Sequence, residues 1–83
     1  MNQFDKMMLA IRTERVLNEI YEEIDFAAAK GLSSIVFELQ SHNLVELAMS
    51  VDIALSKNKA IASSEVELMD NVAKIIVTWE NDE

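Results

Sequence analysis

A single glycine and the absence of proline place the strongest constraint on how this chain of 83 residues can fold. Glycine and proline mark most turns in proteins, so a chain with so few of them favours long elements and few connections. The one glycine, Gly31, follows three alanines and Lys30. A run of good helix formers, then a base, then glycine is typical of a helix C-terminus. We therefore predict a helix over residues 4–30.

The predicted first helix has two apolar faces. Its main stripe keeps one face at helical spacing and consists of Leu9, Val16, Ile20, Ile24 and Ala27. A second apolar set points roughly the other way and consists of Phe4, Met7, Met8 and Ile11. One straight helix cannot bury both sets in one small core. Either the helix bends near residues 10–13, or the second set meets a partner.

The middle of the chain has the pattern of a strand followed by a second helix. Residues 32–39 alternate and are rich in β formers, which predicts a strand. After a polar connector over 40–43, we predict a helix over 44–57, and Asn43 with Glu46 resembles a capping box. Its inward face carries Leu44, Leu47, Ala48, Val51 and Leu55. Its other side carries Val45, Met49 and Ile53. These three are either buried in a core that surrounds the helix or exposed as a surplus stripe.

The last third of the chain admits two interpretations. Residues 65–69 alternate, Asp70 and Asn71 form a turn pair, and residues 74–79 are dense in β formers, which predicts a hairpin. A helical face fits the same segment, with Ser64 and Glu67 as its cap. The hairpin gives an α+β fold with a long N-terminal helix, a short strand, a second helix and a C-terminal β-hairpin. The helix gives an all-α three-helix bundle. Because local propensity favours strands, we predict the α+β fold.

Charge and composition exclude several classes of protein. The formal net charge is -8, which opposes direct binding to nucleic-acid backbones and favours basic partners. No stretch reaches the ~18 apolar residues of a membrane span. Without cysteine there are no disulfides and no cysteine zinc sites. We expect one domain over residues 1–83, a cytoplasmic location, and self-association into a homo-oligomer, a common way to stabilise so small a domain.

The sequence contains no recognisable catalytic pattern. The one histidine, His42, lies in the polar connector, and nothing in the sequence orients it as a general base. The acidic cluster over residues 19–25 lacks the histidine partner that a di-metal carboxylate site uses, so we interpret it as a solvated helix face. A single glycine rules out a glycine-rich phosphate loop. We therefore predict a protein that is not an enzyme and that holds no cofactor and no metal.

Two binding hypotheses remain. The first is a non-catalytic protein-binding module, whose surplus apolar residues contact a partner protein or a second copy. That set is Phe4, Met7, Met8, Ile11, Val45, Met49 and Ile53. The alternative is an oligomeric binder that sequesters an anionic nucleotide signal at a subunit interface, with bases to hold the charge and an aromatic ring to stack. Its residues would be Lys6, Arg12, Arg15 and Tyr21. Ordinary pairing of these bases with acidic residues of the same helix is the competing interpretation.

Three segments carry a resemblance to a known group of proteins. They are residues 27–31 (AAAKG), residues 34–37 (SIVF) and residues 75–79 (IIVTW). In this order, and with a helix between the last two, they resemble small accessory proteins of tailed bacteriophages over roughly residues 14–80. This chain departs from that pattern because it lacks a glycine after the second helix. The resemblance implies a phage accessory protein that binds or inhibits a host or defence protein in the host cytoplasm, and it assigns no functional residue.

Overall fold

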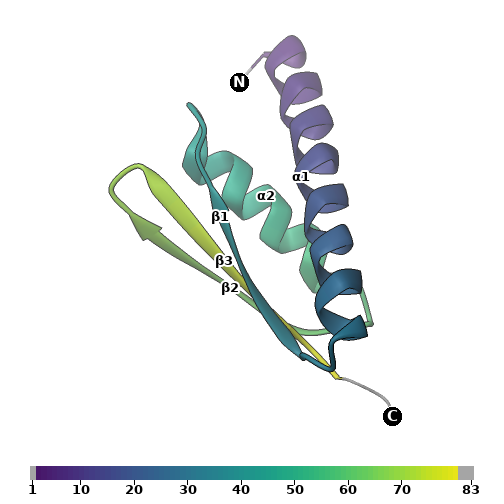
Figure 1. Cartoon of the computed structure of the whole chain (residues 1–83). Coiled ribbons are helices and arrows are strands. Elements are labelled where there is room, and N and C mark those ends of the chain that lie inside the picture. Colours follow the sequence, from purple (N-terminus) through teal and green to yellow (C-terminus); the bar gives the residue numbers. More distant parts are fainter. Residues whose placement is uncertain (1, 81–83) are drawn as a thin grey trace.

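The computed structural model describes residues 2–80, which form two helices and one three-stranded antiparallel sheet (Figure 1). Helix α1 spans Gln3–Ala29, strand β1 spans Ser34–Leu39 and helix α2 spans Leu44–Ser56. Strands β2, Ile61–Met69, and β3, Val72–Trp79, form the C-terminal hairpin. The α+β prediction is therefore confirmed, and the alternative three-helix bundle is wrong.

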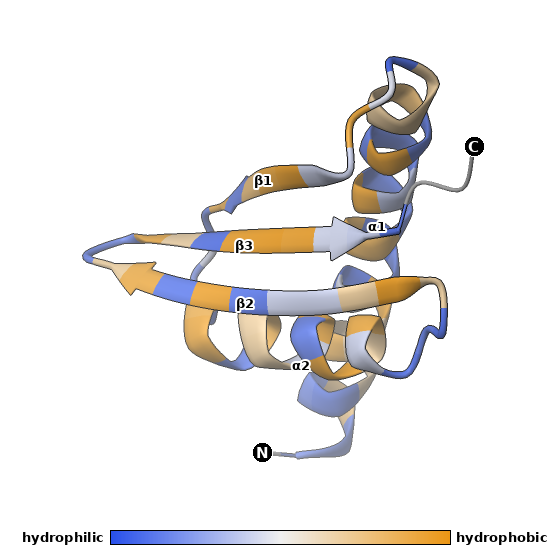
Figure 2. Cartoon of the chain, turned by 90° about the horizontal axis from the view of Figure 1, so that it is seen from below, coloured by the Kyte–Doolittle hydropathy of each residue, from blue (hydrophilic) through white to orange (hydrophobic). Residues whose placement is uncertain are grey.

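The last strand of the chain lies in the middle of the sheet, whose order is β1-β3-β2. Both neighbours run antiparallel to β3, so β1 and β2 are parallel to each other and α2 is the crossover between them. This is a split β-α-β arrangement with α1 added before it. Figure 2 shows β3 between its two neighbours, with β1 and β2 at the two edges.

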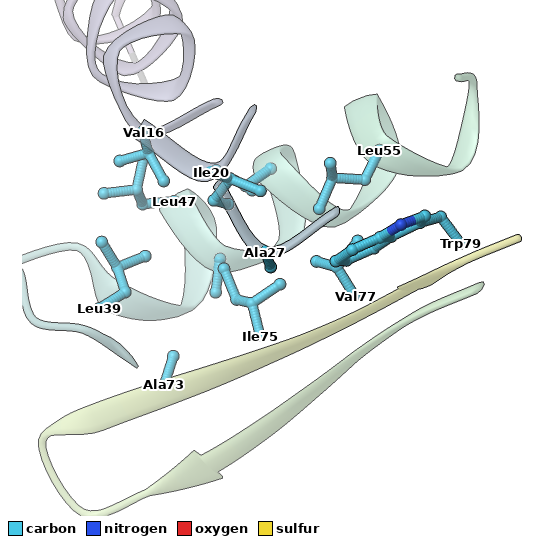
Figure 3. Close-up of a cluster of buried hydrophobic side chains, with 12 residues drawn as sticks. Val16, Ile20, Ala27, Leu39, Leu47, Leu55, Ala73, Ile75, Val77 and Trp79 are labelled. Atoms are coloured by element: carbon cyan, nitrogen blue, oxygen red, sulfur yellow. The ribbon is translucent and has the colours of Figure 1, made fainter. Parts of the chain in front are cut away.

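The core lies between one face of the sheet and the inward stripes of both helices (Figure 3). Successive side chains of a strand point to opposite faces, and β3 buries one set of them completely or nearly so. That set is Ala73, Ile75, Val77 and Trp79. The helices contribute Val16, Ile20, Ala27, Leu47, Ala48, Val51 and Leu55. Both inward helix stripes predicted from the sequence are thereby confirmed, with their remaining members half-buried against this core.

Gly31 ends α1 as the sequence predicts. Its φ is +83°, in the left-handed region that favours glycine. The Gly31 N–H donates to the Ala28 carbonyl at 2.9 Å, and the Leu32 N–H donates to the Ala27 carbonyl at 3.0 Å. These two bonds make a Schellman motif, which satisfies carbonyls that the end of a helix leaves open. The chain can therefore turn directly from α1 into β1.

The capping-box prediction for α2 is wrong. Asn43 occupies the N-cap position, but its side chain makes no capping hydrogen bond. Its φ of -102° and ψ of 58° depart from the extended conformation in which an N-cap side chain reaches the free N–H groups of the first turn. Only the Asn43 backbone carbonyl joins the helix, by accepting from the Leu47 N–H at 2.9 Å.

Strand β2 is longer than the sequence predicts, because it begins at Ile61 rather than near residue 65. The pairing with β3 shifts between Ile61 and Ser63, which interrupts the alternation that would have marked the strand. Ser64, a cap in the rejected helical interpretation, instead donates from its hydroxyl to Asp52 Oδ1 on α2 at 2.5 Å. Asp70 makes the tight turn into β3 with a φ of +48°.

Candidate partner-binding surfaces

The N-terminal third of α1 extends beyond the buried core, and Leu9 is its one half-buried residue. A helix of 27 residues is about 40 Å long, roughly twice the length of α2. Residues 3–8 are all exposed, and the first buried residue of the helix is Thr13. Figure 1 shows this end of α1 projecting past α2. We call residues 3–11 the overhang.

A buried polar contact marks the point where the core ends along α1. The Thr13 hydroxyl donates to the Leu9 carbonyl at 2.7 Å and lies 3.0 Å from the Ser50 hydroxyl on α2. Since one hydroxyl has one proton to give, Ser50 is the donor in the second bond. This contact ties the two helices together below the overhang, while α1 itself continues without a break through residues 10–13. The second apolar set is exposed on this continuous helix, so it is not buried in the core.

The overhang carries a continuous apolar stripe, which we call the α1 stripe. It consists of Phe4, Met7, Met8 and Ile11, all exposed, with 67% of Phe4 and 58% of Met7 accessible. Their spacing is i, i+3, i+4 and i+7, which keeps them on one side of a helix. At 100° per residue, Ile11 lies about 160° around the helix from both Leu9 and Thr13, the residues that begin the inward face. The α1 stripe therefore faces away from the core, and the structure places these four residues together.

The surplus residues of α2 are exposed as well. Val45, Met49 and Ile53 are each about half accessible, on the side of α2 away from the sheet. Burial on both sides of α2 is therefore ruled out. This second stripe lies on a different helix from the α1 stripe. Between the two helices, a hollow lies beside the first turn of α2, and Met8 is the member of the α1 stripe that lines it. The structure thus distributes the seven predicted contact residues over two neighbouring helices.

The four residues of the anionic-ligand hypothesis point to different places on a single chain. Arg12 donates from Nη2 to the Ser41 hydroxyl, in the loop before α2. The Tyr21 hydroxyl accepts from Asn58 Nδ2 at 3.2 Å, near the far end of α2. Lys6 and Arg15 are exposed. One copy of the chain therefore does not gather these residues into a single site.

Arg12 does line a polar hollow that the sequence did not reveal. The hollow has a volume of about 830 Å³ and lies where α1, the β1–α2 loop and the β2–β3 turn meet. The side chains that line it can all donate hydrogen bonds, and they are Arg12, Gln40, Ser41, His42 and Asn71. The strand pairing explains the meeting, because Leu39 lies opposite Ala73 and thus brings the two connections side by side.

A second depression lies along the outer edge of β1. It has a volume of about 470 Å³, and most of its exposed lining is apolar. Phe26, Leu32, Ile35 and Val36 form its floor and walls, and Glu22 and Lys30 lie at its rim. The sequence pattern hid this surface, because Phe26 lies outside both predicted apolar sets and Val36 falls on the outward side of an alternating strand.

The described part of the chain holds no cluster of three metal-ligating side chains, and neither of its helices is long and apolar enough to cross a membrane. His42 is exposed in the loop between β1 and α2, beside the polar hollow.

Comparison with models of protein families, with curated proteins and with solved structures finds no match to this chain.

Proposed function

We propose that this chain is a non-catalytic, acidic protein-binding module whose partner packs on the α1 stripe. One observation carries the proposal: four large apolar side chains lie together on a helix end that the fold itself leaves uncovered. Exposed apolar groups of this size in one place mark interaction sites, or else an aggregation liability. A phage accessory protein that binds or inhibits a host or defence protein in the cytoplasm is the setting that the sequence resemblance suggests.

The geometry of the α1 stripe favours a particular kind of contact. Residues at i, i+3, i+4 and i+7 are the anchors with which an amphipathic helix enters a hydrophobic groove. Two of the four anchors are methionines, whose flexible side chains adapt to irregular surfaces. The net charge of -8 adds attraction towards a groove with a basic rim. The partner we expect is therefore a protein with an apolar groove and basic residues around it.

The test compares capture of proteins from bacterial lysate by the wild type and by Ile11→Asp. We expect the wild type to retain one protein in stoichiometric amount at moderate salt, and Ile11→Asp or Met7→Asp to lose it. Asn18→Asp is the matched control, because it adds the same charge to an exposed position of the same helix without removing an apolar group. Capture of the same proteins by all these variants would show that the α1 stripe is not the contact surface.

The polar hollow supports a second candidate function, the binding of an anionic ligand such as a nucleotide. Its support is the set of donors that two separate connections bring around Arg12, in a chain that is otherwise strongly acidic. Of the residues predicted for such a site, Arg12 alone lies there, so a second chain would have to supply the others.

Thermal melting with a panel of nucleotides and pyrophosphate tests this second candidate. A bound anion would raise the melting temperature, and Arg12→Ala would remove that shift. Arg15→Ala serves as the control, since it deletes an exposed guanidinium of the same helix. If no member of the panel shifts the wild type, the hollow is not an anion site.

A further inference from the structure

The outer edge of β1 is open to pairing. Within residues 2–80 no strand pairs with that side of β1, because β1 is an end member of the sheet. The other edge of the sheet, β2, is less suited to pairing with another strand. It has a register shift near its start and two carboxylates, Glu65 and Glu67, and each of these features discourages further pairing. Strand β1 has no such irregularity, and its one charged residue is Glu38.

The backbone groups that face outward from β1 can be identified from its pairing with β3. The Trp79 N–H donates to the Ser33 carbonyl at 2.9 Å, so these two residues form a hydrogen-bonded pair. In an antiparallel ladder such pairs alternate with non-bonded ones, so residues 35, 37 and 39 bond to β3. The N–H and C=O groups of Ser34, Val36 and Glu38 therefore point away from the sheet, at the edge where 58% of Val36 is accessible.

We propose that two copies of this chain associate through β1, antiparallel and centred on Val36, to form one continuous six-stranded sheet. This register pairs every outward backbone group of the strand. Val36 lies opposite its own counterpart, and Ser34 lies opposite Glu38 of the second copy. A register centred one residue away would put the inward-facing Ile35 or Phe37 at the axis and leave some outward groups without a partner.

The side chains around the edge are self-complementary about the same axis. A two-fold interface brings each surface patch against a copy of itself, with its ends exchanged. The depression beside β1 has Glu22 and Glu23 one turn before Phe26, and Lys30 one turn after it. Exchanging the ends directs Lys30 of one copy towards the end of the other copy's depression that carries the carboxylates, while Val36 meets its own counterpart at the axis. In this register, Glu38 of one copy does not lie opposite Glu38 of the other copy.

This charge arrangement favours a second copy over an unrelated strand. Lys30 already lies over the Phe26 ring, with Nζ 4.3 Å from the ring centre, so the cation sits at the apolar patch rather than away from it. A patch with one cation and two anions at opposite ends matches its own two-fold image. The surface is separate from the α1 stripe, so the proposal does not depend on the partner proposed there.

Because the chain has no cysteine, single cysteines test the register directly. In a hydrogen-bonded antiparallel pair the Cα atoms are about 5.5 Å apart, within the ~4.4–6.8 Å that a disulfide spans. Val36→Cys should therefore give a covalent dimer on mild oxidation, as should the double variant Ser34→Cys with Glu38→Cys, whereas Ser34→Cys alone should not. Met49→Cys is the matched control, because 57% of Met49 is accessible against 58% of Val36.

Sedimentation of the unlinked proteins completes the test. The wild type should sediment with twice the chain mass, and Met49→Lys should remain a dimer. Val36→Lys should sediment as a monomer that keeps the circular dichroism of the folded chain and melts at a lower temperature, because it loses the stabilisation that association gives. Ile11→Asp should also remain a dimer, which separates failure of this proposal from failure of the α1 stripe. A monomeric wild type, or equal cross-linking of Val36→Cys and Met49→Cys, would overturn the proposal.

Discussion

The indole of Trp79 is buried against both helices, yet its Nε1–H has no acceptor among residues 2–80 (Figure 3). A buried donor without a partner costs about 1–3 kcal/mol, because its hydrogen bonds to water are lost on folding. The ring nonetheless closes the end of the core beside Leu55 and Val77. The indole therefore contributes through its apolar area, and its polar atom works against that contribution.

Replacing Trp79 by phenylalanine separates these two effects. Trp79→Phe removes the unpaired donor along with part of the ring, so we expect its free energy of unfolding to lie within about 1 kcal/mol of the wild type. Trp79→Ala should lose about 3–5 kcal/mol, because it leaves a cavity in the core. Urea unfolding measures both changes. An equal loss for the two variants would mean that the indole N–H has a partner that stabilises the fold.

Gly31 offers a second test of how a single residue contributes to stability. Nothing lies within 4 Å of the position that a Cβ would occupy there, so only the φ of +83° opposes a side chain. We expect Gly31→Ala to lose about 1–2 kcal/mol, the usual cost of left-handed backbone for an L-residue. Gly31→Asn should lose clearly less, because asparagine tolerates this conformation. Thermal melting compares the two, and a larger loss for Asn than for Ala would contradict the backbone explanation.

At the scale of elements, α1 divides into a part that builds the core and a part that does not. The same substitution can be made in both parts. Ile20 is fully buried, whereas Ile11 lies on the α1 stripe. Ile20→Asp should unfold the protein, because it buries an unpaired charge. Ile11→Asp should change the free energy of unfolding by less than about 0.5 kcal/mol, as surface substitutions usually do. Circular dichroism against temperature distinguishes the two, and comparable destabilisation would place Ile11 in the core.

The elements themselves were largely predictable from the sequence. Helical spacing identified the inward faces of α1 and α2, alternation identified β1, and the residue pair Asp70 and Asn71 identified the turn between β2 and β3. The two predictions that were wrong, the start of β2 and the side-chain cap at Asn43, concern local backbone geometry. The start of β2 is hidden by the register shift after Ile61, and the Asn43 cap is lost because of its dihedral angles. Both are features of backbone geometry that the residue types alone do not specify.

At the scale of the whole molecule, the sequence predicted seven residues that are surplus to the core, but it missed Phe26 and Val36 and did not show how the fold groups them. The α1 stripe could be found because its residues are neighbours on one helix. The polar hollow and the β1 edge could not, because both depend on the strand order β1-β3-β2. That order makes β1 an edge strand and brings the connection around His42 beside Asn71. Neither fact follows from spacing along the chain.

The central claim is that the α1 stripe is covered by another protein in the cell. Site-specific photocross-linking tests it most directly, with a benzophenone amino acid placed at Phe4, where an aromatic ring is already exposed. The same group at Asn18, an exposed polar position of α1, is the control. We predict that irradiation of bacterial cells links the Phe4 position to one protein and the Asn18 position to none. Identical patterns from the two positions, or no adduct from either, would contradict the account.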